Sequence, residues 1–549
     1  MASSYLSSEG SRFLLAGLTP ITLASVASNN DLDEALELVK SPYELAKRIL
    51  KGLEEKLLED YKSSCAFIRN DNMVSESAFR LIIDTDNIVA QSNCSKQILP
   101  QIFHAPAEIV KCDVNECNKH VSSGHISLAL IPLTGTIKIC NKLLIFREKS
   151  RDDVKAFGNA VLATIANSLR NIIHYSLDAL HPRETSSKSE EELYFLVDTT
   201  HGINNITSLM LQAIVELEPL IFFEAKRVYS GNINILYYNS DPALGLPPDP
   251  LKSLKETKDQ NISYYYIMRG NSTSEFNIKY KLRDFIKKHI LKDSHCRDQD
   301  EKCDTILTYI GIYLLQLGLI PWGLYDIEVG DIKEPQPIIE NKYTDTKINY
   351  KVINREDPYL HESMYWLASL VKKAVSEVIE QCGGSAENNC LRYTAFSKAS
   401  IRCFPSHLLK SLSNESHQES SCRGWALELL RSIIEPSARM IFSYELDQWM
   451  EPGKIVKRLS YLAADSLVPS TVDHKTCDRV IGGIKVDEDF CITPMRLQSN
   501  VRNIIAHGGL TGVTHGMVFI FRDYSQKCRL HSICIASPFP EEFIKELLE

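Results

Sequence analysis

The sequence predicts an α/β amino-terminal half followed by a mainly helical carboxyl-terminal half. Three observations predict this division. Short apolar runs alternate with longer amphipathic segments up to about residue 240. A proline-rich stretch, residues 241–250, then interrupts the chain, and helical patterns dominate beyond it. We therefore expect one domain in residues 1–240, a linker with room for a connecting subdomain in residues 241–350, and a second domain in residues 351–549.

The amino-terminal half contains apolar runs that have the length of strands covered on both faces. The expected strands are residues 13–16, 79–83, 126–131, 142–146, 193–197 and 233–238. Between them, longer amphipathic segments predict helices at residues 31–60, in pieces, and 152–178.

The carboxyl-terminal half is dominated by helical periodicity. The expected helices are residues 276–291, 305–318, 361–381, 424–434, 454–464 and 494–507. Two late apolar runs, residues 517–522 and 529–535, predict a β-hairpin after the last of these helices.

Residues 192–205, E-L-Y-F-L-V-D-T-T-H-G-I-N-N, change from an apolar strand to a polar loop and then to a helix. This order is the crossover unit of a parallel sheet, in which ligands bind where strands end and helices begin. Two threonine hydroxyls, the small Gly202 and the following helix N-terminus favour an anionic ligand such as a phosphate. Asp198, Thr199 and Asn204 are equally able to close a turn and cap the helix without binding anything.

Residues 501–510, V-R-N-I-I-A-H-G-G-L, place Arg502, Asn503 and His507 on a short helical turn that two glycines end. An arginine that holds a phosphate, an amide that orients it and an imidazole that moves a proton are what RNA cleavage by the neighbouring 2′-hydroxyl needs. This chemistry requires no metal ligand. Because one copy supplies one imidazole, two copies across a two-fold axis would provide both an acid and a base.

Similar spacings elsewhere in the chain show that an arginine and a histidine alone are a weak signal. They occur at Arg402 and His407, at Arg355 and His361, and, compressed, at Arg170, Asn171 and His174. Pro405 interrupts the first and Pro358 the second, and the third is too short to repeat the geometry. We interpret these as surface arginines and hydrogen-bonded histidines.

Together the two segments resemble the CARF–HEPN ribonucleases that accompany type III CRISPR interference complexes. Residues 196–204, L-V-D-T-T-H-G-I-N, resemble the effector-loop signature of the CARF domain, and residues 502–510, R-N-I-I-A-H-G-G-L, resemble the HEPN active-site signature. Residues 14–20, L-L-A-G-L-T-P, are a weaker match to the first strand and its phosphate-facing turn.

The resemblance implies a Rossmann-like CARF sensor in residues 1–240 and a HEPN nuclease in residues 351–549. In that family the sensor binds cyclic oligoadenylate across a dimer axis, and the nuclease cuts single-stranded RNA without a metal. The implied catalytic residues are Arg502, Asn503 and His507. The implied ligand-binding residues are Gly17, Thr19, Asp198, Thr199, Thr200, His201, Gly202 and Asn204. Cyclic tetra-adenylate is the favoured effector and cyclic hexa-adenylate the second candidate.

Composition limits these expectations. At 549 residues and 44% hydrophobic content, the chain can bury a large core. Its net charge of −9 argues against a protein with an extended basic surface for nucleic acid. Any RNA-binding groove must therefore be local, and RNA binding should weaken as salt increases. No run approaches the roughly 18 apolar residues of a membrane span. Glu9 and Pro20 argue against an export signal at the amino terminus, and we expect a soluble, cytoplasmic protein.

The 15 cysteines include no C-x-x-C pair. A possible zinc set, Cys112, Cys117, His120 and His125, has a spacing that matches no common zinc site. Cys382 and Cys390 bracket a loop compact enough for a disulfide, which a reducing cytoplasm would keep open.

The sequence therefore predicts a cyclic-oligoadenylate-activated, metal-independent endoribonuclease that acts as a homodimer or a higher homo-oligomer. Its products would carry 2′,3′-cyclic phosphate and 5′-hydroxyl ends. The alternative is a nucleotide-sensing regulator whose helical domain binds a partner or nucleic acid without cleavage. A ribonuclease toxin with no effector would leave the polar loop after residue 197 unexplained.

Overall fold

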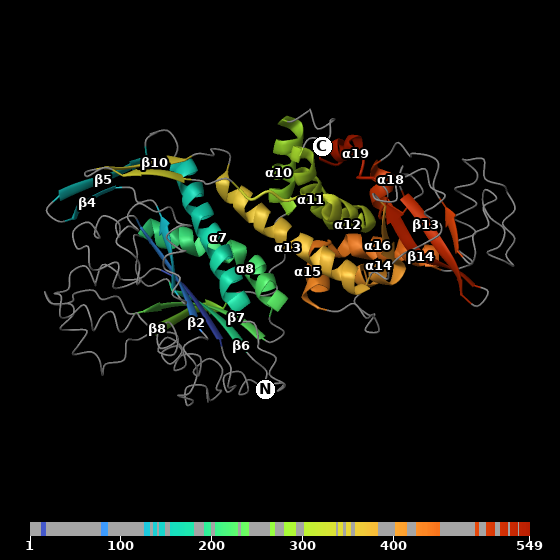
Figure 1. Cartoon of the computed structure of the whole chain (residues 1–549), viewed down its shortest axis with the longest axis horizontal. Helices are drawn as coiled ribbons and strands as arrows, with labels where there is room; N and C mark the ends of the chain where they lie inside the picture. The colour runs from blue at the N-terminus through green and yellow to red at the C-terminus, as the bar shows by residue number, and fades with distance from the viewer. Residues whose placement is uncertain are drawn as a thin grey trace. The chain divides into compact units, whose positions relative to one another are not determined.

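The structure is a computed structural model that describes residues 12–17, 78–85, 126–131, 135–139, 142–148, 154–179, 192–198, 204–228, 232–240, 264–269, 279–292, 301–335, 339–343, 347–352, 357–382, 401–413, 424–450, 489–492, 501–510, 517–524, 527–535 and 537–548. The chain divides into two compact units (Figure 1). Unit 1 contains residues 1–274 and 335–366, and unit 2 contains residues 275–334 and 367–549. Parts of the segment that we expected to link two domains, residues 241–350, therefore fall in both units.

Unit 1 is built on a six-stranded sheet with the strand order β3-β2-β1-β6-β7-β8. Its strands are β1 (Arg12–Gly17), β2 (Ala78–Thr85), β3 (Ile126–Ile131), β6 (Glu192–Asp198), β7 (Asn232–Ser240) and β8 (Tyr264–Arg269). All neighbours are parallel except β7 and β8, which are antiparallel. In β6, Phe195, Leu196 and Val197 are each at most 2% exposed, so both faces of the strand are covered. This confirms the parallel α/β sheet.

Helices α7 (Val154–Ala179) and α8 (Asn204–Val228) pack against each other and against this sheet. Helix α7 also contacts β1, β2 and β3, whereas α8 contacts β7. Both helices bury apolar residues three and seven positions apart, the spacing of one helix face. These residues are Ala166, Leu169 and Ile173 in α7, and Ile214, Leu217 and Ile221 in α8. The helix expected at residues 152–178 is thus confirmed.

A buried hydrogen bond joins α8 to the sheet. The Tyr237 hydroxyl on β7 donates to Glu218 Oε1 on α8 over 2.5 Å. Burial, followed by this hydrogen bond, raises the pKa of the Tyr237 hydroxyl far above its ordinary value. Tyr237 therefore remains a neutral donor, and the pair fixes α8 relative to β7.

A second, four-stranded sheet completes unit 1 and has the order β4-β5-β10-β9. Its strands are β4 (Gly135–Ile139), β5 (Lys142–Glu148), β9 (Ile339–Tyr343) and β10 (Lys347–Val352). Two antiparallel hairpins are joined by the parallel pairing of β5 with β10. The expected strand at residues 142–146 exists, but it belongs to this sheet and not to the parallel one.

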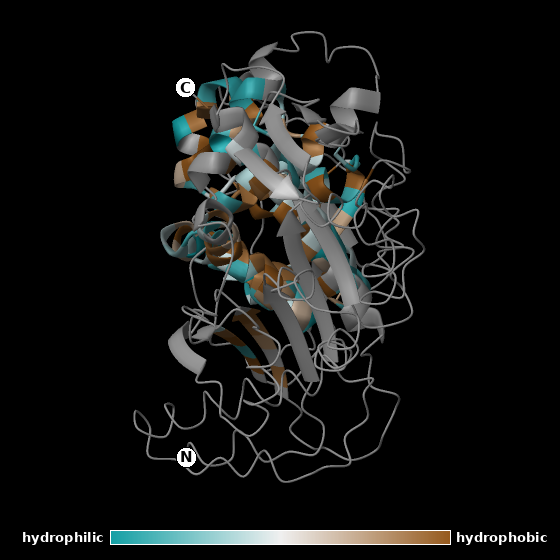
Figure 2. Cartoon of the chain, turned by 90° about the vertical axis from the view of Figure 1, so that its left-hand side faces the viewer, coloured by the Kyte–Doolittle hydropathy of each residue, from teal (hydrophilic) through white to brown (hydrophobic). Residues whose placement is uncertain are grey.

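Unit 2 is largely helical. Its helices are α10 (Lys279–Lys292), α11 (Glu301–Gln316), α12 (Ile320–Val329), α14 (Ser406–Ser413), α15 (Trp425–Ile433), α16 (Pro436–Met450), α18 (Val501–Ala506) and α19 (Glu541–Leu548). Helix α13 (Pro358–Cys382) begins in unit 1 and continues into unit 2. Hydrophilic and hydrophobic residues alternate along the helices (Figure 2), as amphipathic helices require when they bury one face.

Two glycines allow α11 and α12 to approach closely. A Cβ atom on Gly311 would lie 2.7 Å from the Gly323 carbonyl oxygen, and one on Gly323 would lie 2.8 Å from the Gly311 carbonyl oxygen. Either side chain would force the helices apart. Trp322 and Asp326 on α12 are fully buried.

Unit 2 also contains a four-stranded antiparallel sheet with the order β11-β14-β13-β12. Its strands are β11 (Arg402–Pro405), β12 (Asp489–Ile492), β13 (Met517–Tyr524) and β14 (Lys527–Ile535). The predicted hairpin is confirmed as β13 and β14. The sheet adds two strands to it, so unit 2 is less purely helical than we expected.

Unit 2 contains disulfide-bonded cysteines, which we did not expect from the sequence. Cys403 on β11 and Cys534 on β14 are register partners and form a disulfide across a sequence separation of 131 residues. Cys382 is disulfide-bonded as well, where we expected an open loop. Strand pairing brings Cys403 and Cys534 together, and no local spacing in the sequence indicates that pairing.

Several expected features lie outside the described residues. They are the helices at residues 31–60 and 454–464, the proline-rich stretch 241–250, and the cysteines and histidines considered for zinc. Of the helix expected at residues 494–507, the structure describes the part from residue 501. Within the described segments, no helix is both long and apolar enough to cross a membrane.

Candidate functional site

The first candidate site lies where the strand order of the parallel sheet reverses. Strands β1 and β6 are parallel neighbours, and from them the chain order runs outward in both directions. In such sheets ligands bind at the carboxyl ends of the strands beside this switch point. Gly17, the last residue of β1, is the register partner of Asp198, the last residue of β6. The structure thus brings together two predicted ligand-binding positions that are far apart in sequence.

Helix α8 begins at Asn204, a third predicted position, soon after β6 ends. The N-terminus of a helix presents unpaired backbone N–H groups, which favour anionic groups. The other predicted residues, Thr19, Thr199, Thr200, His201 and Gly202, lie outside the described residues. The described part of this site is therefore a backbone frame, two adjacent strand ends followed by a helix start.

The second candidate site is the end of α18 in unit 2. Val501 and Ile504 are at most 4% exposed and anchor the helix, and Leu510 after it is fully buried. Arg502 lies on the exposed side, and the His507 side chain is 41% exposed. The helix therefore presents the predicted arginine and histidine to solvent from a fixed base. The Asn503 backbone is part of α18, and its side chain lies outside the described part of the structure.

His507 is the capping residue of this helix. The Gly509 N–H donates to the Ile504 carbonyl over 2.8 Å, and the Gly508 N–H donates to the Ile505 carbonyl over 3.0 Å. This pair of bonds is the Schellman motif, which needs a left-handed residue directly after the cap. Gly508 supplies it with φ of 58°, and Gly509 is also left-handed at 75°. The prediction that two glycines end a short helix beside His507 is confirmed.

A buried carboxylate that sequence reasoning missed contacts the histidine. Glu445 Oε1, on α16, lies 3.2 Å from His507 Nδ1. Glu445 is only 5% exposed, among the buried side chains Phe442, Leu446 and Trp449 of its own helix. A charged residue inside an apolar helix stripe is the signal that could have identified it, because buried carboxylates are rare unless they have a partner.

Helix α16 holds the segment after α18 at further points. The Trp449 indole N–H donates to the Leu510 carbonyl over 3.2 Å, and its ring stacks on Phe519 of β13 with the ring centres 4.7 Å apart. A Cβ on Gly508 would lie 3.1 Å from the Phe442 ring. The position of His507 is therefore fixed by packing on both sides of it.

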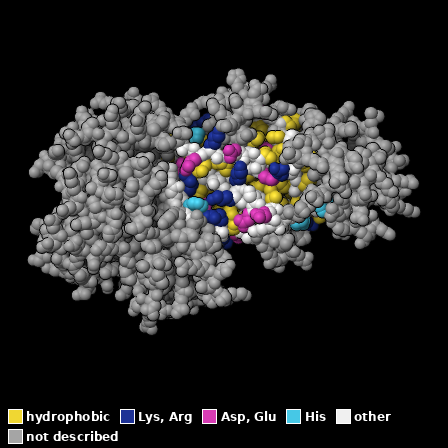
Figure 3. Space-filling view, viewed as in Figure 1, with side chains coloured by type: hydrophobic (Ala, Val, Ile, Leu, Met, Phe, Trp, Pro, Cys, Tyr) yellow, Lys and Arg dark blue, Asp and Glu magenta, His cyan; other side chains and the backbone are white. Residues whose placement is uncertain are grey.

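The charge pattern agrees with the low net charge of the chain. On the face shown in Figure 3, the Lys and Arg side chains of the described residues lie among Asp and Glu side chains. Such a mixed surface fits local RNA contacts better than extended binding along a basic face.

The arginine and histidine pairs that we interpreted as structural have structural partners. Arg402 Nε donates to Glu328 Oε1 over 2.6 Å, and His407 Nε2 lies 3.0 Å from the Cys382 carbonyl oxygen. Arg170 Nε donates to Glu362 Oε1 over 3.0 Å. These contacts account for the residues without a catalytic role. Arg355 lies outside the described residues.

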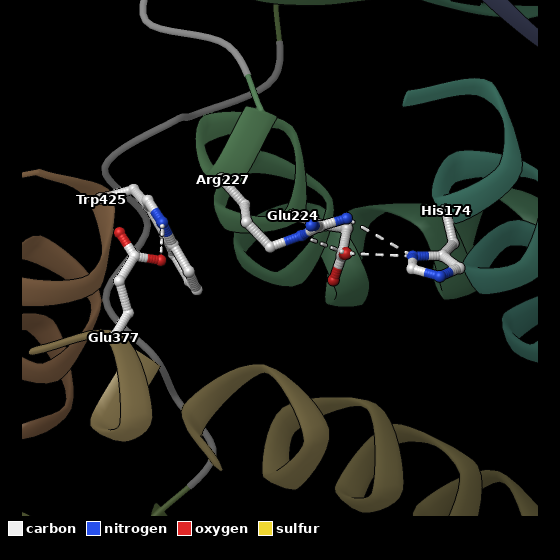
Figure 4. A network of polar contacts seen from close by, with 5 residues as sticks. All are labelled: His174, Glu224, Arg227, Glu377 and Trp425. Atoms are coloured by element: carbon white, nitrogen blue, oxygen red, sulfur yellow. Dashed lines mark hydrogen bonds and ion pairs between the residues drawn. The ribbon is translucent and has the colours of Figure 1, made fainter. Parts of the chain in front are cut away.

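His174 belongs to a small polar network between α7 and α8 (Figure 4). Its Nδ1 lies 3.6 Å from Glu224 Oε1 and 3.4 Å from Arg227 Nη2. Arg227 Nε donates to the same Glu224 oxygen over 3.0 Å. Figure 4 also draws a bond within unit 2, in which the Trp425 indole donates to Glu377 Oε2 over 2.8 Å and ties α15 to α13.

Comparison with known proteins identifies the domain in unit 1. Residues 19–242 match the family model described as the CARF domain of the CRISPR system endoribonuclease Csx1. No curated protein sequence matches the chain. Among solved structures, Enterococcus italicus Csm6 bound to cyclic hexa-2′-fluoro-hexa-dAMP aligns over 80% of this chain and 98% of its own, at 9% identity and a TM-score of 0.18. That score is too low for a comparison of geometry. The matched residues, on a sheet with a Rossmann-type switch point, show that unit 1 contains a CARF domain similar to that of the type III CRISPR effectors.

Proposed function

We propose that the chain is a cyclic-oligoadenylate-activated endoribonuclease that cuts single-stranded RNA without a metal. The observation that carries the proposal is the arrangement at the end of α18. There, Arg502 is exposed and His507 is half-exposed. The buried Glu445 contacts His507, and two left-handed glycines end the helix beside it. The CARF domain supplies the sensing half of the proposal.

The effector would bind at the carboxyl ends of β1 and β6. Gly17 lets the ligand approach the backbone, and the residues between Asp198 and Asn204 would contact its phosphates. A cyclic oligoadenylate suits a dimer because its repeated phosphates can contact the same loop in both copies. We favour cyclic tetra-adenylate, with cyclic hexa-adenylate as the second candidate.

In the proposed reaction, one His507 removes the proton of the 2′-hydroxyl as that oxygen attacks the adjacent phosphorus. Arg502 stabilises the negative charge that develops on the phosphate oxygens. The bond from phosphorus to the 5′-oxygen breaks, and an imidazolium gives that oxygen a proton. The products are a 2′,3′-cyclic phosphate and a 5′-hydroxyl. We assign Asn503 to orienting the phosphate.

A homodimer would bring a second His507 to serve as the acid. Exposed apolar side chains on α16 support such an interface: Met440 is 69% exposed, Tyr444 63% and Ile441 39%. At about 100° per residue, these three side chains share a face that adjoins the edge carrying Glu445. Contiguous exposed apolar side chains favour burial against another protein surface. A two-fold contact here would place two sites near each other.

The alternative is a nucleotide-sensing regulator whose unit 2 binds a partner or nucleic acid without cutting. Such a protein needs no solvent-facing histidine hydrogen-bonded to a buried carboxylate. RNA cleavage by the purified protein separates the two readings.

The test compares wild type with His507→Ala on single-stranded RNA, with cyclic tetra- or hexa-adenylate and with or without EDTA. We expect effector-stimulated cleavage by wild type that survives EDTA, and a loss of at least about 100-fold in His507→Ala, because the proton acceptor is gone. Effector binding should be unchanged, since His507 is in unit 2 and the CARF sheet is in unit 1.

The control is His407→Ala, which removes a histidine whose contact is a backbone carbonyl. It should cut as wild type does. Wild-type cleavage by His507→Ala would contradict the catalytic assignment. Loss of activity in EDTA that magnesium or manganese restores would indicate a metal-dependent mechanism instead.

A further inference from the structure

We propose that Glu445 is a positioning residue for the proposed ribonuclease reaction and that it makes Nε2 of His507 the nitrogen that exchanges protons with RNA. The inference rests on the proposed function and adds to it a residue, together with the identity of the reacting atom. The spacing of Arg502 and His507 in the sequence indicates neither Glu445 nor which ring nitrogen reacts.

The hydrogen bond between the two side chains determines the tautomer. Glu445 Oε1 and His507 Nδ1 are 3.2 Å apart, and a carboxylate oxygen can only accept. The Nδ1 atom therefore carries the hydrogen. In the neutral ring this leaves a lone pair on Nε2, and in the imidazolium Nε2 carries the second proton. One nitrogen can thus act as base in one copy and as acid in the other, while Nδ1 keeps its hydrogen throughout.

Burial separates the roles of the two residues. Glu445 is 5% exposed, whereas the His507 side chain is 41% exposed. The carboxylate therefore faces protein, and the imidazole remains accessible to substrate. Because RNA cannot reach Glu445, the carboxylate acts through the ring and not on the reacting atoms. Its location away from water also strengthens the hydrogen bond that holds the ring.

One face of α16 fixes the ring with respect to the backbone. The contact positions on α16 follow helical spacing, and each meets one residue of the segment that ends α18. The contacts are Phe442 with Gly508, Glu445 with His507, and Trp449 with Leu510. The Gly508 and Leu510 contacts flank His507, so the backbone on either side cannot shift independently of Glu445. The ring is therefore oriented before any substrate binds, which is the condition for effective proton transfer.

The carboxylate also supports the step in which charge appears on the ring. When Nε2 takes the proton of the 2′-hydroxyl, the imidazole becomes an imidazolium. The negative charge of Glu445, whose Oε1 lies 3.2 Å from Nδ1, attracts this cation. The transferred proton stays on Nε2.

The experiment measures kcat and KM for single-stranded RNA at saturating effector in Glu445→Gln and Glu445→Asp. A glutamine has the same shape, but its amide can donate to Nδ1, which favours the tautomer with hydrogen on Nε2. We expect kcat to fall about 100-fold in Glu445→Gln, with KM at the wild-type value. Glu445→Asp keeps the carboxylate and should restore part of the lost kcat.

Nitrogen-15 spectra of histidine-labelled protein give a readout that a merely structural role does not change. The signal of the His507 ring is identified by its absence in His507→Ala. In wild type we expect the hydrogen of the neutral ring on Nδ1, and in Glu445→Gln we expect it on Nε2. Hydrogen on Nε2 in the wild-type neutral ring would overturn the proposal.

The matched control is Glu224→Gln, which alters a buried glutamate beside a histidine in unit 1. It should leave kcat unchanged. If Glu445→Gln does not fold, as thermal unfolding will show, the wild-type spectrum and the Glu445→Asp kinetics decide. A Glu445→Gln variant with wild-type kcat beside an inactive His507→Ala overturns this inference alone. Cleavage by His507→Ala overturns the proposed function.

Discussion

Asp326 is a carboxyl group inside unit 2 with 0% exposure to solvent. Its Oδ1 accepts a long hydrogen bond, 3.4 Å, from the Phe539 N–H, and no group of the described residues bonds its buried Oδ2. Desolvation raises the pKa of this carboxyl well above its ordinary value, although the Phe539 N–H opposes the shift. The protein therefore folds around a neutral carboxylic acid at a pH where an exposed aspartate is ionised.

This burial predicts a stability that falls with pH. Because the folded-state pKa is raised, the folded state holds a proton that the unfolded chain releases above about pH 4. The contribution is complete below that pH and is lost as pH rises toward the folded pKa, by about 1.4 kcal/mol per pH unit. Asp326→Asn cannot ionise, so its free energy of unfolding should lack this slope in denaturant titrations between pH 4 and 8. Exposed Asp284→Asn is the control, and parallel curves for wild type and Asp326→Asn would contradict the prediction.

The sequence suggested the two candidate residues that lie in one short motif, and it gave no sign of the buried carboxylate that contacts one of them. Arg502 and His507 were found because both belong to one short motif. Glu445 was not, because 62 residues separate it from His507 and because no helix was predicted at α16. Arg402 and His407, which we set aside because Pro405 lies between them, contact Glu328 and the Cys382 carbonyl.

The end of α18 is an element whose shape depends on one backbone conformation. Gly508 has a φ of 58°, and a Cβ there would lie 3.1 Å from the Phe442 ring and 3.2 Å from the Phe442 Cα. The positive φ disfavours any residue that has a Cβ. The short distance to the Phe442 Cα shows that the backbone of the neighbouring helix would also have to move. The helix stop and the packing of α16 thus both require glycine.

Gly508→Ala should therefore lower the free energy of unfolding by about 1–2 kcal/mol, the usual cost of a left-handed residue with a Cβ. Its cleavage rate should fall as well, because His507 is the adjacent cap. Gly158→Ala on α7 provides the contrast, since no atom of the residues that the structure describes lies within 4 Å of the added Cβ. It should stabilise by about 0.5–1 kcal/mol through helix propensity. Equal effects of the two substitutions in thermal unfolding would show that Gly508 is not conformationally required.

Helices and strands could be predicted where the hydrophobic pattern of the segment itself indicates them. The strands of the parallel sheet follow from continuous apolar runs, and α7 and α13 follow from long amphipathic repeats. Strands β9 and β10 are short and rich in polar residues, and their sheet forms through the pairing of β10 with β5 and of β9 with β10, so no continuous apolar run indicated them. Helix α12 was missed because Pro321 and Gly323 suggest a break. The proline lies in the first turn, where no N–H bond is lost, and the glycine permits the contact with α11.

At the scale of the whole molecule, effector binding and RNA cleavage are proposed to occur in different units. Gly202 lies in the chain between the end of β6 and the start of α8, where a side chain would occupy space near the proposed phosphates. Each change in a symmetric dimer acts twice on one bound ring. A defect in this loop should therefore alter the response to effector and leave the chemistry of unit 2 as it is.

We expect Gly202→Val to require at least about tenfold more cyclic oligoadenylate for half-maximal cleavage, equivalent to about 1.4 kcal/mol of lost binding. Cleavage without effector should equal that of wild type. The control is Val215→Ala on α8, a side chain 40% exposed and remote in sequence from the loop. A titration of cleavage rate against effector distinguishes the outcomes. An unchanged response would place the ligand elsewhere, and loss of basal cleavage would mean that the loop is structural.

The path of the chain between the units has a consequence for biosynthesis. Unit 1 is made of two separate stretches of the chain, residues 1–274 and residues 335–366. Between them the chain forms the first part of unit 2, residues 275–334. Strand β5 pairs with β10 (Lys347–Val352), so the four-stranded sheet of unit 1 cannot form until β10 has been synthesised. During translation unit 1 therefore cannot finish folding before the first helices of unit 2 have been made. A ribosome stalled near residue 274 would hold a unit 1 in which β5 lacks its partner β10. Expression of the sensor alone requires the returning strands to be supplied, for example by joining residues 335–366 directly to residue 274.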